Sequence, residues 1–154
     1  MAELEKIQVH GWLQDVNENF EKLGSLAGLH ITKFVFDVDE DDAASTPVSN
    51  KTVAAHPMAV KIPANAIVIS GFLDVIDAVT SGGSATVAVG LSTNALIAAT
   101  GKATLLENAQ LPMAAVIAAP FKLAAETAIT VTVGTSALTA GVIEGRIIWM
   151  EGSE

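Results

Sequence analysis

Three alternating aspartates are the residues of this chain whose spacing most resembles a metal site. Asp37, Asp39 and Asp41 follow the pattern of hard oxygen ligands that opens a calcium-binding loop. Such a loop then requires a glycine and, further on, a bidentate glutamate, but the chain has Asp42 and Val48 at those positions. An EF-hand is therefore excluded. The alternatives are an irregular cation site formed by the three aspartates and a solvated acidic linker.

The other candidates for acid, base or metal chemistry stand alone. Asp74 and Asp77 lie three residues apart in a predicted strand, so we expect them on opposite faces of a sheet and not as an acid/base pair. No histidine has a second one at helical or alternating spacing, and all three are expected to be structural: His10, His30 and His56. With no triad, carboxylate pair or metal cluster, the chain is predicted not to be an enzyme and to need no cofactor.

A glycine pair in TSGGSATVAVG (80–90) raises the question of a phosphate-binding loop. Such a loop continues into Lys-Ser/Thr and a helix, because helix and loop N–H groups hold the anion. Here Gly82 and Gly83 are followed by a valine-rich strand pattern instead. We therefore predict a hairpin turn with positive φ angles, joining a strand over 66–79 to one over 84–91.

Charge is distributed unevenly along the chain, whose formal net charge is −9. Residues 1–42 carry ten acidic and three basic side chains, and residues 43–154 carry seven and five. No cluster of Lys and Arg is present, which argues against nucleic-acid binding. Because so few charges cover the second region, its composition favours burial against copies of itself or within a larger assembly.

Membrane association and disulfide bonding are not expected. The chain has no cysteine, and its longest apolar stretch (109–121) is interrupted by Pro112 and Pro120. That stretch is shorter than the roughly 20 apolar residues of a membrane-spanning helix. The N-terminus lacks the basic and then apolar order of a secretory signal, so we expect the protein to stay in the cytoplasm in which it is made.

The elements that would position these residues fall into two groups. Within residues 1–30 we predict an amphipathic helix that ends near Gly24 and Gly28. Its apolar stripe consists of Leu13, Val16, Phe20 and Leu23. Because the stripe is as narrow as a coiled-coil seam, it packs either on its own domain or on copies of itself.

The rest of the chain has the period of two that is typical of strands. Strands are predicted over 31–38, 52–62, 66–79, 84–91, 128–134 and 142–150, with weaker candidates over 103–106 and 113–123. The predicted fold is mainly β, an antiparallel β-sandwich or jelly roll over residues 51–154. A strand and an acidic linker (31–50) connect it to the N-terminal helix (1–30).

Two long segments resemble small virion proteins of tailed bacteriophages, in particular capsid decoration or head-fibre-like proteins. They are KIPANAIVISGFLDVIDAVTSGGSATVAVGLSTNALIAA (61–99) and FKLAAETAITVTVGTSALTAGVIEGRIIWM (121–150). Upstream, WLQDVNENFEKL (12–23) is similar to helices near the N-termini of phage fibre and attachment proteins.

This resemblance implies a non-enzymatic virion protein, assembled in the host cytoplasm, that decorates or stabilises a capsid. It implies a homo-oligomer, typically a trimer, that binds the major capsid protein or another virion protein. The stripe of the N-terminal helix would then be the oligomer or capsid contact. A receptor- or ligand-binding module of a phage fibre or tail is the alternative, and it would require a polar cleft formed by the loops at 80–84, 92–95 and 135–141.

Overall fold

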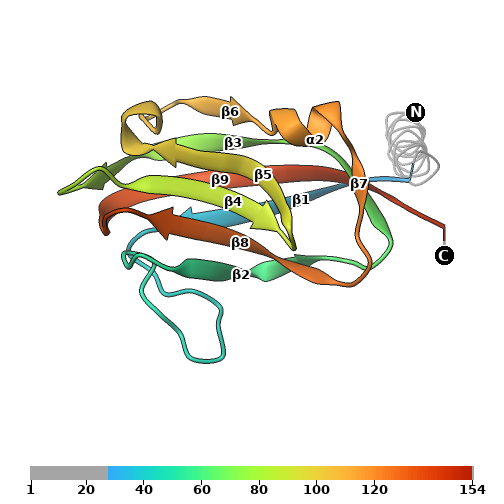
Figure 1. Ribbon diagram of the computed structural model, residues 1–154, viewed down its shortest axis with the longest axis horizontal. Helices are drawn as coiled ribbons and strands as arrows, with labels where there is room; N and C mark the ends of the chain where they lie inside the picture. Colours follow the sequence, from blue (N-terminus) through green and yellow to red (C-terminus); the bar gives the residue numbers. More distant parts are fainter. Residues whose placement is uncertain (1–27, 154) are drawn as a thin grey trace, which may run out of the picture. The chain divides into compact units, whose positions relative to one another are not determined.

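The computed structural model describes residues 28–153, which form two antiparallel β-sheets. One sheet has the strand order β1-β9-β3-β6, with β7 also paired to β3, and the other has the order β2-β8-β4-β5. The elements are β1 (Leu29–Asp37), β2 (Ala55–Ile62), β3 (Ala66–Ser81), β4 (Thr86–Leu91), β5 (Asn94–Gly101), η1 (Lys102–Thr104), β6 (Gln110–Pro112), α2 (Ala114–Ala118), β7 (Phe121–Lys122), β8 (Thr127–Gly134) and β9 (Leu138–Glu151). Figure 1 shows the two sheets stacked as layers.

The chain divides into two compact units, Met1–His30 and Ile31–Glu154. The second unit is the sandwich, and it contains the predicted strand at 31–38 and the acidic segment that follows it. The prediction of a mainly β fold with two antiparallel sheets is confirmed. The predicted N-terminal helix lies outside the described residues.

One hydrophobic core lies between the two sheets, because alternate residues of each strand point inward. In β9 the buried residues Ile143, Gly145, Ile147 and Trp149 alternate with partly exposed ones. In β4 and β8 the buried residues are valines, isoleucine and leucine at every second position. The period of two read from the sequence therefore corresponds to the inner and outer faces of the sandwich.

The edge strand β1 is fastened to β9 by contacts along its length. The Trp149 indole N–H donates to Thr32 Oγ1 at 2.8 Å, and the Val38 N–H donates to the Gly141 carbonyl at 3.0 Å. Between them the Phe34 ring lies directly against Gly145, where a Cβ would overlap ring carbons. Glycine at 145 therefore leaves the space that the buried phenylalanine fills.

The sandwich has two sides on which edge strands of both sheets lie, and these sides differ in what joins the two sheets. On one side, the segment 38–54 connects edge strand β1 to edge strand β2 (Figure 1). On the opposite side lie the edge strands β5 and β6, with α2 packed near β5 and β3. A groove lies on this second side.

The predicted hairpin turn at Gly82 and Gly83 is wrong. Strands β3 and β4 belong to different sheets, so this segment crosses between the layers, and neither glycine has a positive φ. A Cβ at Gly83 would collide with the side chain of Ser136, which packs against the backbone there. The glycine therefore permits a close approach between two loops and does not serve a primed turn.

The expected opposite orientation of Asp74 and Asp77 is also wrong. The pairing of β3 with β9 shifts between Val75 and Asp77, as at a β-bulge. Asp74 lies opposite Glu144, and Asp77 lies opposite Val142, two residues away on β9. Both aspartates therefore face the outer side of the sheet, because one extra residue in β3 cancels the alternation.

The two weaker strand predictions also differ from the structure, and one strand of the structure was not predicted. Residues 103 and 104 belong to the short helical turn η1 and residues 105 and 106 to no element, and 113–123 contain helix α2 and only the two-residue strand β7. Strand β5 was not predicted, because its adjacent buried residues Leu96 and Ile97 break the alternation. Its pairing with β4 is irregular at the same point, between Val87 and Gly90.

Replacement of Gly145 by valine tests the contact with Phe34. We expect Gly145→Val to lower the free energy of unfolding by about 1–3 kcal/mol, because the ring must leave its position in a filled core. Gly101→Ala is the matched control, since no atom lies within 4 Å of the added Cβ. Urea denaturation of both variants measures the difference, and equal stability of the two would contradict this role for Gly145.

Candidate interaction surfaces

A groove lies on the side of the sandwich where the edges of the two sheets meet. It has a volume of about 300 Å³ and lies between β5, β6 and the start of α2. Its lining is uncharged and mainly apolar: Leu96, Ile97, Ala98, Thr100, Gln110, Leu111, Pro112, Ala114 and Ala115. We call this the β5–β6 groove.

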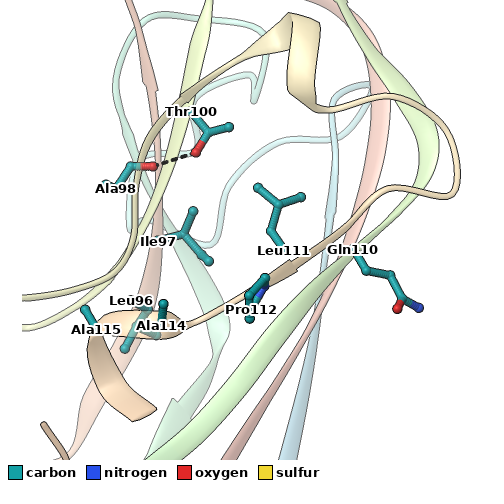
Figure 2. A pocket seen from close by; sticks show the side chains of 9 residues that line it. All are labelled: Leu96, Ile97, Ala98, Thr100, Gln110, Leu111, Pro112, Ala114 and Ala115. Carbon is teal, nitrogen blue, oxygen red and sulfur yellow. Dashed lines mark hydrogen bonds between the residues drawn. The ribbon is translucent and has the colours of Figure 1, made fainter. Parts of the chain in front are cut away.

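Figure 2 shows how these side chains are arranged. Ile97 of β5 and Leu111 of β6 project from the two facing strands, and Ala114 and Ala115 of α2 lie at one end. The Thr100 hydroxyl donates to the Ala98 carbonyl at 2.9 Å, so its hydrogen bond is made within the chain. The groove therefore offers apolar surface and few polar groups, which suits an apolar side chain better than a polar metabolite.

The outer face of the β1-β9-β3 sheet has a charged centre. Lys33 of β1 contacts Glu144 Oε2 at 2.6 Å, and Arg146 contacts Glu144 Oε1. The Arg146 guanidinium also lies over the Phe72 ring, 5.6 Å from its centroid. The hydrogen bond from Lys33 and the charges of both cations hold the pKa of Glu144 below its usual value, although burial acts in the opposite direction. The charges of Lys33, Glu144 and Arg146 are therefore paired within the chain.

A buried histidine–aspartate pair fastens the segment 38–54 to β2. His56 Nδ1 lies 3.1 Å from Asp42 Oδ2, and its Nε2 lies 3.0 Å from the Thr52 carbonyl. The other Asp42 oxygen accepts the N–H groups of Ala44 and Val48, each at 3.1 Å. The two atoms that face the ring nitrogens, Asp42 Oδ2 and the Thr52 carbonyl oxygen, are both hydrogen-bond acceptors.

This pair does not have the arrangement of a catalytic site. The His56 side chain is completely buried and that of Asp42 is 2% exposed, so no substrate reaches either. Both ring nitrogens already have protein partners, and one of them is a backbone carbonyl rather than a nucleophile. The structural role expected for His56 agrees with this geometry, whereas its pairing with Asp42, fourteen residues away, was not foreseen.

Two of the three aspartates of the predicted cation site have partners within the chain. The Asp39 carboxylate forms an ion pair with Lys51 at 2.7 Å, and Asp37 Oδ1 accepts the Asp39 N–H at 2.9 Å. Over residues 28–153, no three His, Cys, Asp or Glu side chains are grouped closely enough to hold a metal ion. A cation site at Asp37, Asp39 and Asp41 remains a prediction.

The predicted contact stripe cannot be placed. Leu13, Val16, Phe20 and Leu23 lie outside the described residues. The groove, in contrast, was missed, because it depends on β5, β6 and α2, none of which was predicted. Two prolines, Pro112 and Pro120, bracket α2 and were the available signal of a short separate element. Within the described part of the chain, no helix has the length and apolar character needed to cross a bilayer.

Acid should weaken the attachment of the segment 38–54. The N–H groups of Val48 and Ala44, with His56, hold the pKa of Asp42 below its ordinary value despite burial. A carboxyl whose pKa is lowered on folding stabilises the protein above its unfolded pKa, and this stabilisation disappears as the pH falls through the folded value. We therefore expect the melting temperature to decrease below about pH 4, the range in which an ordinary aspartate is protonated.

The measurement is the melting temperature from pH 2 to 6 for the wild type, Asp42→Asn and Asp41→Asn. Asp42→Asn should be less stable at pH 6 and should show a shallower decrease in acid. Asp41→Asn alters an exposed carboxyl one residue away and serves as the control. A wild type and an Asp42→Asn variant with parallel pH profiles would show that Asp42 does not contribute to acid sensitivity.

No protein-family model matches the chain. No curated protein matches it in sequence either.

Three solved structures with a similar fold are of phage capsids. A chain of the acidic stable capsid of Helicobacter pylori bacteriophage KHP30 matches with a TM-score of 0.52 and 14% identity, over 81% of this chain and 89% of that chain. A chain of the capsid of Ralstonia phage GP4 gives 0.53 and 19%, over 81% and 86%. A chain of the cyanophage Pam1 capsid asymmetric unit gives 0.54 and 14%, over 80% and 84%. At these identities the likeness shows that the chain shares their fold.

Proposed function

We propose that this protein is a non-enzymatic structural component of a phage virion. The observation that carries the proposal is the likeness of its fold to chains of three phage capsids, over at least 80% of each chain in every comparison. Because the alignments cover most of both partners, those chains are also close to this one in length.

The surfaces of the sandwich are consistent with a role in assembly. The described residues have exposed apolar side chains on β1 and α2 and an apolar groove between β5 and β6. Their histidine–aspartate pair is sealed from solvent. Uncharged and apolar surface of this kind favours protein contacts over the chemistry of a polar active site.

We infer more specifically that the protein decorates or stabilises the capsid as a homo-oligomer, and we take this to be the trimer that the sequence resemblance implies. Its partners are then copies of itself and the major capsid protein or another virion protein. The N-terminal stripe of Leu13, Val16, Phe20 and Leu23 is the proposed oligomer or capsid contact. The proposed location is the virion, after assembly in the host cytoplasm.

The direct test is the presence of the protein in purified virions, measured by mass spectrometry and by antibody labelling of intact particles. We expect a fixed, stoichiometric amount that remains after extensive washing. Its absence from virions made in infected cells that contain the soluble protein would refute the proposal.

Substitution of the stripe tests the role of the N-terminal segment in the full chain. Leu13→Glu with Phe20→Glu should reduce binding to capsids, or dissociate the oligomer, by at least about thirtyfold, because two apolar contacts are replaced by charges. Gln14→Glu with Asn19→Gln alters polar positions of the same segment and is the control. Unchanged capsid binding together with an unchanged oligomer would exclude the stripe as a contact.

A receptor- or ligand-binding module of a fibre or tail is a second candidate, favoured by one observation. A hollow of about 270 Å³ lies beside the loop 92–95 and has polar side chains from Ser92, Thr93, Asn94 and Thr132. The loops at 80–84 and 135–141 do not line it. Binding of the isolated protein to a glycan array or to host cells, lost on Asn94→Ala, would support this function over the capsid role.

A further inference from the structure

Part of the irregular connection between β1 and β2 adds no apolar side chain to the hydrophobic core (Figure 1). Within residues 40–50, all of which the structure describes, the two buried residues are polar, Asp42 and Asn50. The largest hydrophobic residue of this range, Val48, is 40% exposed. We call residues 40–50 the flap. Because apolar burial is the main source of stability in a fold, the flap depends on hydrogen bonds for its attachment.

A short ladder of hydrogen bonds makes the flap a unit of its own. The Asn50 N–H donates to the Glu40 carbonyl at 3.0 Å, and the Asp42 N–H donates to the Val48 carbonyl at 2.9 Å. An antiparallel bridge lies between these two bonds. Oδ1 of Asp42 accepts two further N–H groups of the flap. These bonds involve no strand of either sheet, so they stay intact when the flap moves as a whole.

The two ends of the flap are held together at a neck that is fixed to the sandwich. Asn50 Nδ2 donates to the carbonyl of Asp37, the last residue of β1, at 2.7 Å. The Val38 N–H and the Lys51 carbonyl, on either side of the flap, are both hydrogen-bonded to β9, at 3.0 and 2.9 Å. Compact surface loops whose ends lie close together in this way have a defined structure of their own. The neck therefore stays in place while the flap moves.

Over residues 28–153, two hydrogen bonds attach the flap to the sandwich beyond this neck. Asp42 Oδ2 lies 3.1 Å from His56 Nδ1 on β2. The Ala43 N–H donates to the Pro57 carbonyl, also on β2, at 2.9 Å. His56 is held from its other side by the Thr52 carbonyl, which lies outside the flap and 3.0 Å from Nε2. The imidazole is therefore the fixed part of the Asp42–His56 contact, and the carboxylate is the moving part.

The flap lies at the open edge of β2, which is the last strand in the order β2-β8-β4-β5. Its Ala43 N–H occupies the Pro57 carbonyl at this edge. A strand edge without such cover presents unpaired backbone groups to other chains. The closed flap therefore covers part of the β2 edge.

We propose that the flap opens as a unit about its neck while both sheets stay intact, and that the Asp42–His56 contact is the latch that keeps it closed. Opening breaks the two hydrogen bonds to β2 and leaves the core between the sheets in place, because no side chain of the flap belongs to that core. Regions with few buried apolar contacts open locally at a lower free energy than the core. The open flap uncovers the edge of β2. This device does not depend on the proposed virion role.

Hydrogen exchange of the full-length protein, followed by mass spectrometry at constant neutral pH, tests the opening with three variants. Asp42→Ala removes the moving part of the latch. Asp41→Ala changes an exposed carboxyl one residue away and is its matched control. Ile147→Val removes one methyl group from a fully buried position of β9 and so weakens the sandwich alone. Circular dichroism establishes that each variant is folded, and Asp42→Asn replaces Asp42→Ala if that variant does not fold.

In the wild type we expect amides of the flap to exchange faster than amides of β3 and β9, which become accessible only when the sandwich unfolds. Asp42→Ala should accelerate exchange in the flap at least about tenfold, because hydrogen bonds to a buried carboxylate are lost. Asp41→Ala should leave it unchanged. Ile147→Val should accelerate exchange in β3 and β9 about two- to tenfold, the effect of one methyl group deleted from a core. It should not change exchange in the flap.

Three outcomes would overturn the inference. Acceleration of the flap amides by Ile147→Val to the same extent as the amides of β3 and β9 would show that the flap opens only when the whole sandwich unfolds. Wild-type flap amides as strongly protected as those of β3 and β9 would show the same. Equal exchange in the flap of Asp42→Ala and Asp41→Ala would mean that Asp42 is not the latch. The comparison of the wild type with Ile147→Val requires no change in the flap, so it decides the matter even if both substitutions of Asp42 prevent folding.

Discussion

The pairing of β3 with β9 is the constraint on which the rest of the structure depends. These two long strands run antiparallel along the length of the sandwich, and β1, β6 and β7 are all attached to one or the other. Their inward residues, such as Val75 and Ile143, form one wall of the core, and their outward residues carry the Glu144 ion pairs. The bulge near Val75 places Asp77 on the same outer face as Asp74.

The two sides of the sandwich illustrate two ways of closing the gap between sheet edges. On the side of β1 and β2, a polar segment is held by the buried Asp42–His56 pair, in which every acceptor of the carboxylate has a donor. On the side of β5 and β6, closure relies on the five-residue helix α2, whose small alanines leave the groove unfilled. The first side is therefore closed by hydrogen bonds within the chain, whereas the second side keeps an apolar groove.

More of the fold than of the candidate interaction surfaces could be predicted from the sequence. Strands whose apolar residues alternate, including β1, β3, β8 and β9, were predicted close to their observed bounds, because alternation directly reflects one buried and one exposed face. Strand β5 was missed because Leu96 and Ile97 are adjacent and both buried. The groove was missed with it. The stripe of the N-terminal segment and the proposed cation site at Asp37, Asp39 and Asp41 remain predictions.

The sequence by itself determined the fold class, the scarcity of charge after residue 42 and the absence of disulfide bonds, because composition and periodicity are local properties of the chain. Only the tertiary structure decided which sheet each strand joined, and hence that Gly82 and Gly83 lie in a crossing between layers. It also brought Asp42 to His56 and Lys33 to Glu144, and it formed the groove between β5, β6 and α2. These relations depend on pairing between distant segments, which no local pattern encodes.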